Sequence, residues 1–167
     1  MYKQILPEQF EKNIFDAIGR QWMLITAKKP DGSFNTMTAS WGGMGVLWNK
    51  NVFFCFVRPQ RYTHEFIEET NEISLSFLKN EYKVAYNICG KKSGRDCDKI
   101  AEAKLTPVQD GGFVYFEQAD TVIYGKKLYK DTLKENGFIG IDPSQFYKDD
   151  FHTVYICEIK SILIEDK

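Results

Sequence analysis

The sequence predicts a mainly β protein, an antiparallel β-barrel decorated with short helices. Six or so apolar segments of strand length follow one another along the chain, and tight turns join several of them. Strands do not alternate with long helices, which would indicate a parallel sheet of βαβ units. The chain has 167 residues, the usual size of one compact domain, so we expect a single domain over residues 1–167.

A short amphipathic helix is expected first, over residues 7–18. Apolar residues recur at helical spacing from Phe10 to Ile18. Pro7 suits the first turn of a helix and Gly19 suits its end, which together set the expected limits.

A hairpin is expected next. Residues 21–28 (QWMLITAK) have the composition of a strand, Pro30-Asp31-Gly32 favours a turn, and a second strand begins near Phe34. Further elements are expected in this order: strand 51–57, helix 64–69, strand 72–78, helix 82–88 and helix 97–103.

The second half of the chain returns to strands. We expect strands at residues 113–116, 121–128 and 153–164, the last with Glu158 and Lys160 interrupting a run of aliphatic residues. Between the last two strands, residues 129–150 are polar and contain glycines and a proline that would break a long helix. This stretch is expected to be an excursion over the surface.

Composition and charge exclude several classes of protein. Twenty-two Lys and Arg residues against 23 Asp and Glu give a net charge of -1, which argues against binding to the nucleic-acid backbone. No apolar run approaches the roughly 18 residues of a membrane span, and the first residues carry no export signal. We therefore expect a soluble protein of the cytoplasm with no nucleic-acid or membrane partner.

The cysteines agree with that compartment. Cys55, Cys89, Cys97 and Cys157 are widely spaced and form no CxxC pair, and two of them lie in apolar runs. Free thiols that pack as small hydrophobic groups are the favoured interpretation over disulfides. With only two isolated histidines, no metal site is expected.

The usual nucleotide and hydrolase motifs are absent. The single GxG lacks the third glycine of a dinucleotide fingerprint, and the segment Gly90-Lys91-Lys92-Ser93-Gly94 lacks the spacing of a P-loop. No GxSxG elbow occurs.

Residues 35–45 (NTMTASWGGMG) form the first candidate for a binding site. The segment begins as a strand and ends in glycines, which places hydroxyl side chains and bare backbone N–H groups beside an aromatic residue. A flat heteroaromatic ligand would fit against such a backbone. The alternative is a plain strand that ends in a glycine-rich turn.

Two further segments are candidates for an anion site. Thr63 falls near the start of the helix at 64–69, where its hydroxyl and free N–H groups can hold a phosphate beside Arg58 or Arg61. In SGRDCDK (93–99), Ser93, Arg95 and Lys99 can do the same. The alternatives are a capped helix with solvated arginines and a solvated charged turn.

Together these segments resemble the flavin reductase-like family of FMN-binding split barrels, especially its flavoredoxin-like branch. The strings NTMTASWGGMG, RPQRYTHEFI and SGRDCDKI occur in the order and spacing typical of that family, and FHTVYICEIKSILIE is similar to its closing strand. SGRDCDKI is the most specific of them. The resemblance implies a split β-barrel of Greek-key type.

The resemblance also implies a cofactor, FMN, and the residues that hold it. Backbone and side chains of residues 37–41 would lie along the isoalloxazine ring and the ribityl chain, and a group of polar residues would share the phosphate. The expected cofactor-binding residues are Asn35, Met37, Thr38, Ala39, Ser40, Trp41, Arg58, Tyr62, Thr63, Ser93, Gly94, Arg95 and Lys99.

Similar proteins transfer electrons through the flavin, so the resemblance implies an oxidoreductase. Its partner would be NAD(P)H or a redox protein, and the chain would form a homodimer. The alternative is a flavin carrier without turnover. No catalytic side chain is assigned, because the cofactor performs the redox step. His152 is interpreted as a polar residue at a strand entry, and residues 119–150 as a polar insert that would cover the substrate side.

Overall fold

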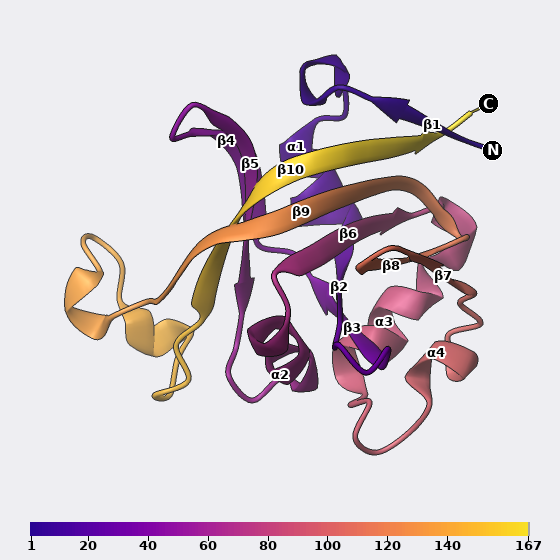
Figure 1. The fold of residues 1–167 in the computed structure, drawn as a ribbon. Coiled ribbons are helices and arrows are strands. Elements are labelled where there is room, and N and C mark those ends of the chain that lie inside the picture. The colour runs from indigo at the N-terminus through magenta and orange to yellow at the C-terminus, as the bar shows by residue number, and fades with distance from the viewer. Residues whose placement is uncertain (167) are drawn as a thin grey trace.

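One large antiparallel sheet dominates the structure, a computed structural model that describes residues 1–166 (Figure 1). Its strands run in the order β3-β2-β6-β9-β10-β5-β4, and β1 pairs with β10. The mainly β class is confirmed. The strands are β1 (Tyr2–Ile5), β2 (Met23–Lys28), β3 (Phe34–Ala39), β4 (Gly42–Leu47), β5 (Lys50–Val57), β6 (Glu72–Leu78), β9 (Ala119–Thr132) and β10 (Thr153–Glu165), and β7 (Pro107–Asp110) pairs with β8 (Phe113–Phe116) in a separate hairpin.

The sheet is open between its first and last strands. Across the part of the chain that the structure describes, no ladder joins β3 to β4, although the chain passes between them through only Ser40 and Trp41. Glycines at the start of β4 let this strand lie close to β5, because a Cβ at Gly42 would be 2.6 Å from the Phe54 carbonyl oxygen. The split therefore lies beside Ser40 and Trp41.

Both faces of the sheet are buried, and the two-residue period of the strands divides the core in two. Ile25 and Ile123 point into one cluster, whereas Leu24 and Val122 point into the other. Helix α2 (Tyr62–Glu69) packs its Phe66 and Ile67 into the first cluster, and α3 (Val84–Lys91) packs on the second with the short α4 (Lys99–Glu102) beside it. Cys55, Cys89 and Cys157 are buried free thiols, as expected.

The predicted N-terminal helix is wrong. The stretch 7–18 instead forms a 3-10 turn (Pro7–Gln9), a single helical turn α1 (Ile14–Asp16) and a π-helical turn (Ala17–Gln21). Asn13 has extended backbone angles and its side chain accepts a hydrogen bond from the Asp16 N–H, so it starts a new helix and breaks the longer one. Phe10 and Ile14 still pack against the core, which explains the apolar spacing.

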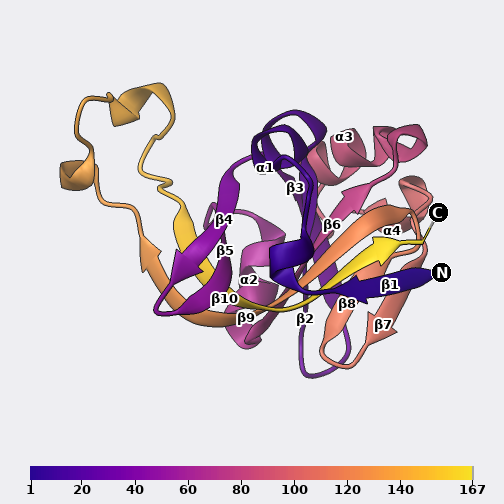
Figure 2. The same ribbon diagram turned by 90° about the horizontal axis from the view of Figure 1, so that it is seen from above.

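The predicted surface excursion exists but begins later than expected. Residues 129–132 continue β9, so the part of the proposed insert before residue 133 is a strand of the main sheet. Residues 133–151 form an arm with two short 3-10 turns, Glu135–Gly137 and Pro143–Gln145. Figure 2 shows this arm projecting away from the sheet beyond the ends of β9 and β10. Among the residues described, no helix is long and apolar enough to cross a membrane.

Candidate functional site

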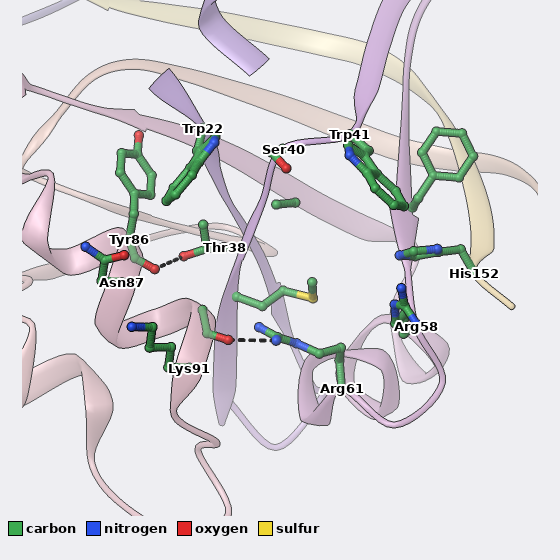
Figure 3. Close-up of a pocket in the computed structure, with 14 residues that line it drawn as sticks. Trp22, Thr38, Ser40, Trp41, Arg58, Arg61, Tyr86, Asn87, Lys91 and His152 are labelled. Carbon is green, nitrogen blue, oxygen red and sulfur yellow. Dashed lines mark hydrogen bonds between the residues drawn. The ribbon is translucent and has the colours of Figure 1, made fainter. Parts of the chain in front are cut away.

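A cavity of about 360 Å³ lies where the sheet is split (Figure 3). The end of β3, the helix α3, the segment that leads into α2 and the residue before β10 all contribute to it. This volume is within the range of small-molecule sites. The lining residues are Trp22, Met37, Thr38, Ala39, Ser40, Trp41, Phe56, Arg58, Arg61, Tyr86, Asn87, Gly90, Lys91 and His152.

Strand β3 forms one wall of this cavity and is an edge of the sheet. It pairs with β2 on one side only, so alternate residues present their N–H and C=O groups on the other side, away from β2. The Thr38 hydroxyl donates a hydrogen bond to the Tyr86 carbonyl oxygen at 2.6 Å, which ties the strand to α3. The wall therefore offers backbone donors and acceptors to a flat ligand.

Aromatic side chains line the mouth of the cavity. Trp22 and Trp41 are 38% and 44% exposed, high values for tryptophan. Trp22 lies edge-on to Tyr86 with 6.3 Å between ring centroids, and Trp41 lies 5.2 Å from the His152 ring. Trp22 also has a positive φ of 72°, a conformation that is rare for a bulky residue. Exposed aromatic rings, one of them on a strained backbone residue, are typical of a site that receives a ligand.

Arg61 lies at the floor of the cavity. Its guanidinium donates hydrogen bonds to the carbonyl oxygens of Gly90, at 2.8 Å, and Cys89, at 3.2 Å, which are exposed at the C-terminal end of α3. Within residues 1–166 no carboxylate lies within 4 Å of it. Burial lowers the pKa of Arg61, because the charged form loses its solvation.

A second cavity, of about 90 Å³, adjoins the first and shares Arg61 and Lys91 with it. The side chain of Lys99 reaches this cavity, and Lys99 is only 3% exposed. Its ammonium group donates one hydrogen bond, to the Lys92 carbonyl oxygen at 3.3 Å, and burial lowers its pKa. The cavity is lined by Gln60, Arg61, Tyr62, Thr63, Lys91, Lys92, Ser93 and Lys99.

A buried cation without an anionic partner is costly, so the Lys99 environment favours a bound anion. No described carboxylate pairs with Lys99. Thr63 is oriented for the same purpose: its oxygen accepts a hydrogen bond from the Asn35 amide at 2.8 Å, which leaves its hydroxyl hydrogen free to donate.

On the opposite side of the large cavity, the arm contacts two of the lining residues. Arg58 forms an ion pair with Asp150 and donates a hydrogen bond to the Phe146 carbonyl oxygen at 2.8 Å. His152 Nδ1 is 2.9 Å from the Tyr147 hydroxyl, and the residue is 7% exposed. Burial and the nearby Arg58 charge lower the pKa of His152 to about 4, so the imidazole is neutral at pH 7.

The structure brings most of the predicted site residues together. Six line the large cavity, namely Met37, Thr38, Ala39, Ser40, Trp41 and Arg58, and four line the small one, namely Tyr62, Thr63, Ser93 and Lys99. The remaining three, Asn35, Gly94 and Arg95, contact residues of the small cavity without lining it. Arg58 lies beside His152 and lines only the large cavity.

Several lining residues were not predicted from sequence. Trp22, Phe56, Tyr86, Asn87 and His152 come from four different parts of the chain. No local motif marks them, although an aromatic residue between a glycine and an apolar strand was a usable indication for Trp22. His152 was expected to be a polar residue at a strand entry. It does precede β10, but it has a hydrogen-bond partner and lines the cavity.

Comparisons with known proteins give one matching family model and several structures of similar fold. The model of the flavin reductase like domain matches residues 15–167. Flavoredoxin of Desulfovibrio vulgaris is 20% identical with a TM-score of 0.69, covering 97% of this chain and 78% of that one. An FMN-binding domain of a flavin reductases-like enzyme from Shewanella baltica is 12% identical with a TM-score of 0.70, covering 98% and 77%.

A third structural neighbour is an NADH:FAD oxidoreductase of Streptomyces globisporus, with 12% identity, a TM-score of 0.64, and coverage of 87% of this chain and 75% of that one. At these identities the neighbours establish the fold alone, a split barrel of the FMN-binding type. No curated protein matches the sequence.

Proposed function

The chain belongs to the flavin reductase-like family of flavin-binding oxidoreductases, and we propose that it binds FMN and passes hydride or electrons through it from NAD(P)H or a protein donor. The observation that carries the proposal is the pair of adjoining cavities. One is large, with aromatic walls and an edge strand. The other is small and contains a buried, unpaired ammonium group.

The chemistry of the two cavities fits FMN. The isoalloxazine ring is flat, with carbonyl and ring-nitrogen acceptors that match the free N–H groups of an edge strand. A terminal phosphate is a dianion and requires several charge-assisted donors, which Arg61, Lys99 and the Thr63 hydroxyl supply. The two cavities share Arg61 and Lys91, so one ligand with a ring at one end and a phosphate at the other would occupy both.

The cofactor-binding residues would divide between the ring and the phosphate in the same way. Met37, Thr38, Ala39, Ser40 and Trp41 would lie along the ring and the ribityl chain. Tyr62, Thr63, Ser93 and Lys99, together with Arg61, would surround the phosphate, and Asn35 would orient Thr63. Arg58 was expected at the phosphate, but its position beside His152 and its ion pair with Asp150 favour a place near the ring.

When bound, the flavin accepts and donates hydride or single electrons. The protein contributes binding and orientation. Trp22, Trp41 and Phe56 give the large cavity apolar walls against which a flavin ring would pack, and the neutral His152 presents an imidazole held by Tyr147. No protein nucleophile is needed for such a reaction, which agrees with the lack of a catalytic triad motif in the sequence.

We also propose that the chain forms a homodimer in the cytoplasm. Large apolar side chains such as Phe15 and Val46 are exposed at 89% and 74%, and they would be covered by a second copy. Reduced, buried cysteines are typical of a reducing compartment. Light scattering at micromolar concentration tests the dimer, and a monomeric mass would contradict it.

The function is tested by the visible absorption spectrum of the purified protein. The spectrum is recorded before and after anaerobic addition of NADH or NADPH. A flavin spectrum that bleaches rapidly with either nucleotide is expected and identifies the donor. A flavin spectrum that resists both indicates a protein donor, or a flavin carrier if reduced redox proteins also leave it unchanged. A colourless protein that cannot be loaded with FMN would refute the proposal.

A further inference from the structure

The imidazole of His152 has a hydrogen-bond partner on one of its two nitrogens. Nδ1 faces the hydroxyl of Tyr147 in the arm, whereas within residues 1–166 Nε2 has no hydrogen-bond partner. Resting on the function proposed above, we infer that Tyr147 is a positioning residue for His152. Its hydroxyl donates to Nδ1 and so keeps the ring hydrogen on Nε2, where the N–H is available to the flavin in the large cavity.

His152 lies at the edge of the large cavity and is almost fully buried. The centroid of its ring is 5.2 Å from that of Trp41 and 6.2 Å from that of Phe56. Figure 3 shows the imidazole between Trp41 and Arg58. The two nitrogens are on different sides of the imidazole ring, so the nitrogen that does not face the arm is the one that a ligand in the cavity can reach.

The hydrogen in the bond between Tyr147 and His152 comes from the phenol. Both groups are neutral at pH 7, because burial raises the pKa of Tyr147, and burial and the Arg58 charge lower the pKa of His152 to about 4. The Tyr147 hydroxyl has no second hydrogen-bond partner among the residues described. If it accepted a hydrogen from Nδ1, its own hydrogen would have no partner in the protein. When it donates, Nδ1 is the acceptor and the ring hydrogen is on Nε2.

Arg58 makes the phenol a stronger donor. Its guanidinium lies over the Tyr147 ring, 5.1 Å from the centroid, and pairs with Asp150 of the same arm. A nearby positive charge stabilises negative charge on the phenol oxygen, which favours donation of the hydrogen. The Tyr147 ring is also stacked on Phe151 with 4.8 Å between centroids. Two contacts of the ring therefore hold the hydroxyl at Nδ1.

An N–H group beside aromatic walls needs an acceptor, and a ligand in the cavity can supply it. The flavin ring has carbonyl and ring-nitrogen acceptors. When the flavin is reduced, it carries more negative charge, and a fixed donor then stabilises it more strongly than it stabilises the oxidised ring. Tyr147 does not line the large cavity, so its effect on the flavin is transmitted by His152.

Nuclear magnetic resonance of the flavin-free, full-length protein tests the position of the hydrogen. The chain has only two histidines, so ¹⁵N labelling of histidine reports each ring separately, and His152→Gln assigns the signals. Spectra are compared for the natural chain, Tyr147→Phe and the control Tyr129→Phe. Tyr129 is partly exposed, its hydroxyl contacts Asp131, and it lines neither cavity.

In the natural chain at pH 7.5, His152 is expected to carry its hydrogen on Nε2 alone. A ring nitrogen that carries hydrogen and one that does not have well-separated ¹⁵N shifts. Tyr147→Phe keeps the aromatic ring and removes the donor, so both tautomers should be populated and the two shifts should move toward each other. Tyr129→Phe should leave both shifts unchanged, and His64 should be the same in all three proteins.

The effect on the flavin is measured as the preference for reduced over oxidised FMN. A flavin fluorescence titration gives the dissociation constant of oxidised FMN, and the midpoint potential of the bound flavin gives the ratio of the two affinities. Tyr147→Phe should change the first by less than about twofold and lower the preference by about threefold to tenfold, a fall of about 14 to 30 mV in a two-electron potential. Tyr129→Phe should change neither.

Other outcomes overturn the inference at separate steps. If the natural chain carries the hydrogen on Nδ1, or if Tyr147→Phe leaves both shifts unchanged, Tyr147 does not set the tautomer of His152. If the shifts change but the potential does not, the N–H does not face the flavin. If the protein binds no flavin, the proposed function fails and the role toward the ring fails with it, while the spectra of the flavin-free protein still decide whether Tyr147 positions His152.

Discussion

Tyr147 and His152 are joined by a hydrogen bond of 2.9 Å between the phenol oxygen and Nδ1, and this bond connects the arm to the wall of the large cavity. Arg58 reinforces the connection, because its guanidinium lies 5.1 Å from the centroid of the Tyr147 ring and pairs with Asp150. A histidine that we expected to stand alone is therefore oriented by the segment just before it in sequence.

The first prediction concerns the pH dependence of stability. The pKa of His152 in the folded protein is about 4, below the ordinary value of 6.5, because of burial and the Arg58 charge. The folded state thus binds this proton less readily than the unfolded state, and the free energy of unfolding is expected to fall as the pH drops from about 6.5 toward 4. The free energy of unfolding, measured with urea, falls between pH 7.5 and pH 5. This fall should be roughly 2 kcal/mol larger in the natural chain than in His152→Gln.

His64 provides the matched comparison for that experiment, since it is the other histidine and burial lowers its pKa too. His64→Gln should retain the His152 contribution. An equal pH dependence in the natural chain and in His152→Gln would show that the imidazole of His152 is not held neutral.

Much of the fold follows from local patterns in the sequence. The apolar strands β2, β5, β6 and β10 are recognisable from composition, because strands buried on both faces leave continuous apolar runs. Strand β4 was missed, since its glycines favour a turn until β5 is known to lie against them. The short strand β1 depends on pairing with β10 at the far end of the chain.

The site was predictable only where its residues are grouped in sequence. The segments at 37–41, 62–63 and 93–99 supply backbone and phosphate-type donors in recognisable order. Tyr86 and His152 reach the cavity because α3 packs on β3 and because β10 pairs with β5, and both contacts are long-range. No spacing in the sequence encodes them.

A second prediction concerns the buried ammonium group. Lys99→Met removes a charge that has only a backbone carbonyl as partner, so the flavin-free protein should become more stable by about 1 kcal/mol. The same change should weaken FMN by about tenfold to a hundredfold, the effect of losing a charge-assisted hydrogen bond worth about 1.5 to 3 kcal/mol. Riboflavin, which lacks the phosphate, should bind unchanged in the same fluorescence titration.

Lys83→Met is the control for this variant, because Lys83 is exposed and lines neither cavity. It should alter neither stability nor affinity. Equal weakening of FMN and riboflavin by Lys99→Met would place the phosphate away from Lys99.

A third prediction concerns the glycine at the split of the sheet. Gly42 has a φ of 154°, and an added Cβ would lie 2.6 Å from the Phe54 carbonyl oxygen, a backbone atom that cannot turn aside. Gly42→Ala should therefore lower the free energy of unfolding by roughly 1–3 kcal/mol, measured by urea denaturation. Gly45→Ala in the same strand has open space around its Cβ and should change it by less than about 0.5 kcal/mol. If Gly42→Ala and Gly45→Ala lower the free energy of unfolding by similar amounts, the contact with the Phe54 carbonyl oxygen is not the cause.

The fourth prediction separates the arm from global stability. Asp150 accepts hydrogen bonds from the Lys148 N–H and the Gln60 amide and pairs with Arg58, contacts that hold its pKa well below the ordinary value and keep it ionised at pH 5. Asp150→Asn keeps the shape but removes the charge. Trypsin should then cleave the arm several-fold faster, at Lys134 or Lys148, while the free energy of unfolding changes by less than about 1 kcal/mol because the pair is partly exposed.

The control for the arm is Asp131→Asn. Asp131 pairs with Lys134, three residues away, so this ion pair does not connect the arm to the cavity wall. Its loss should leave cleavage at Lys148 unchanged. If Asp150→Asn leaves cleavage at both lysines unchanged, the Tyr147–His152 bond and the Phe146 contact with Arg58 hold the arm without the ion pair.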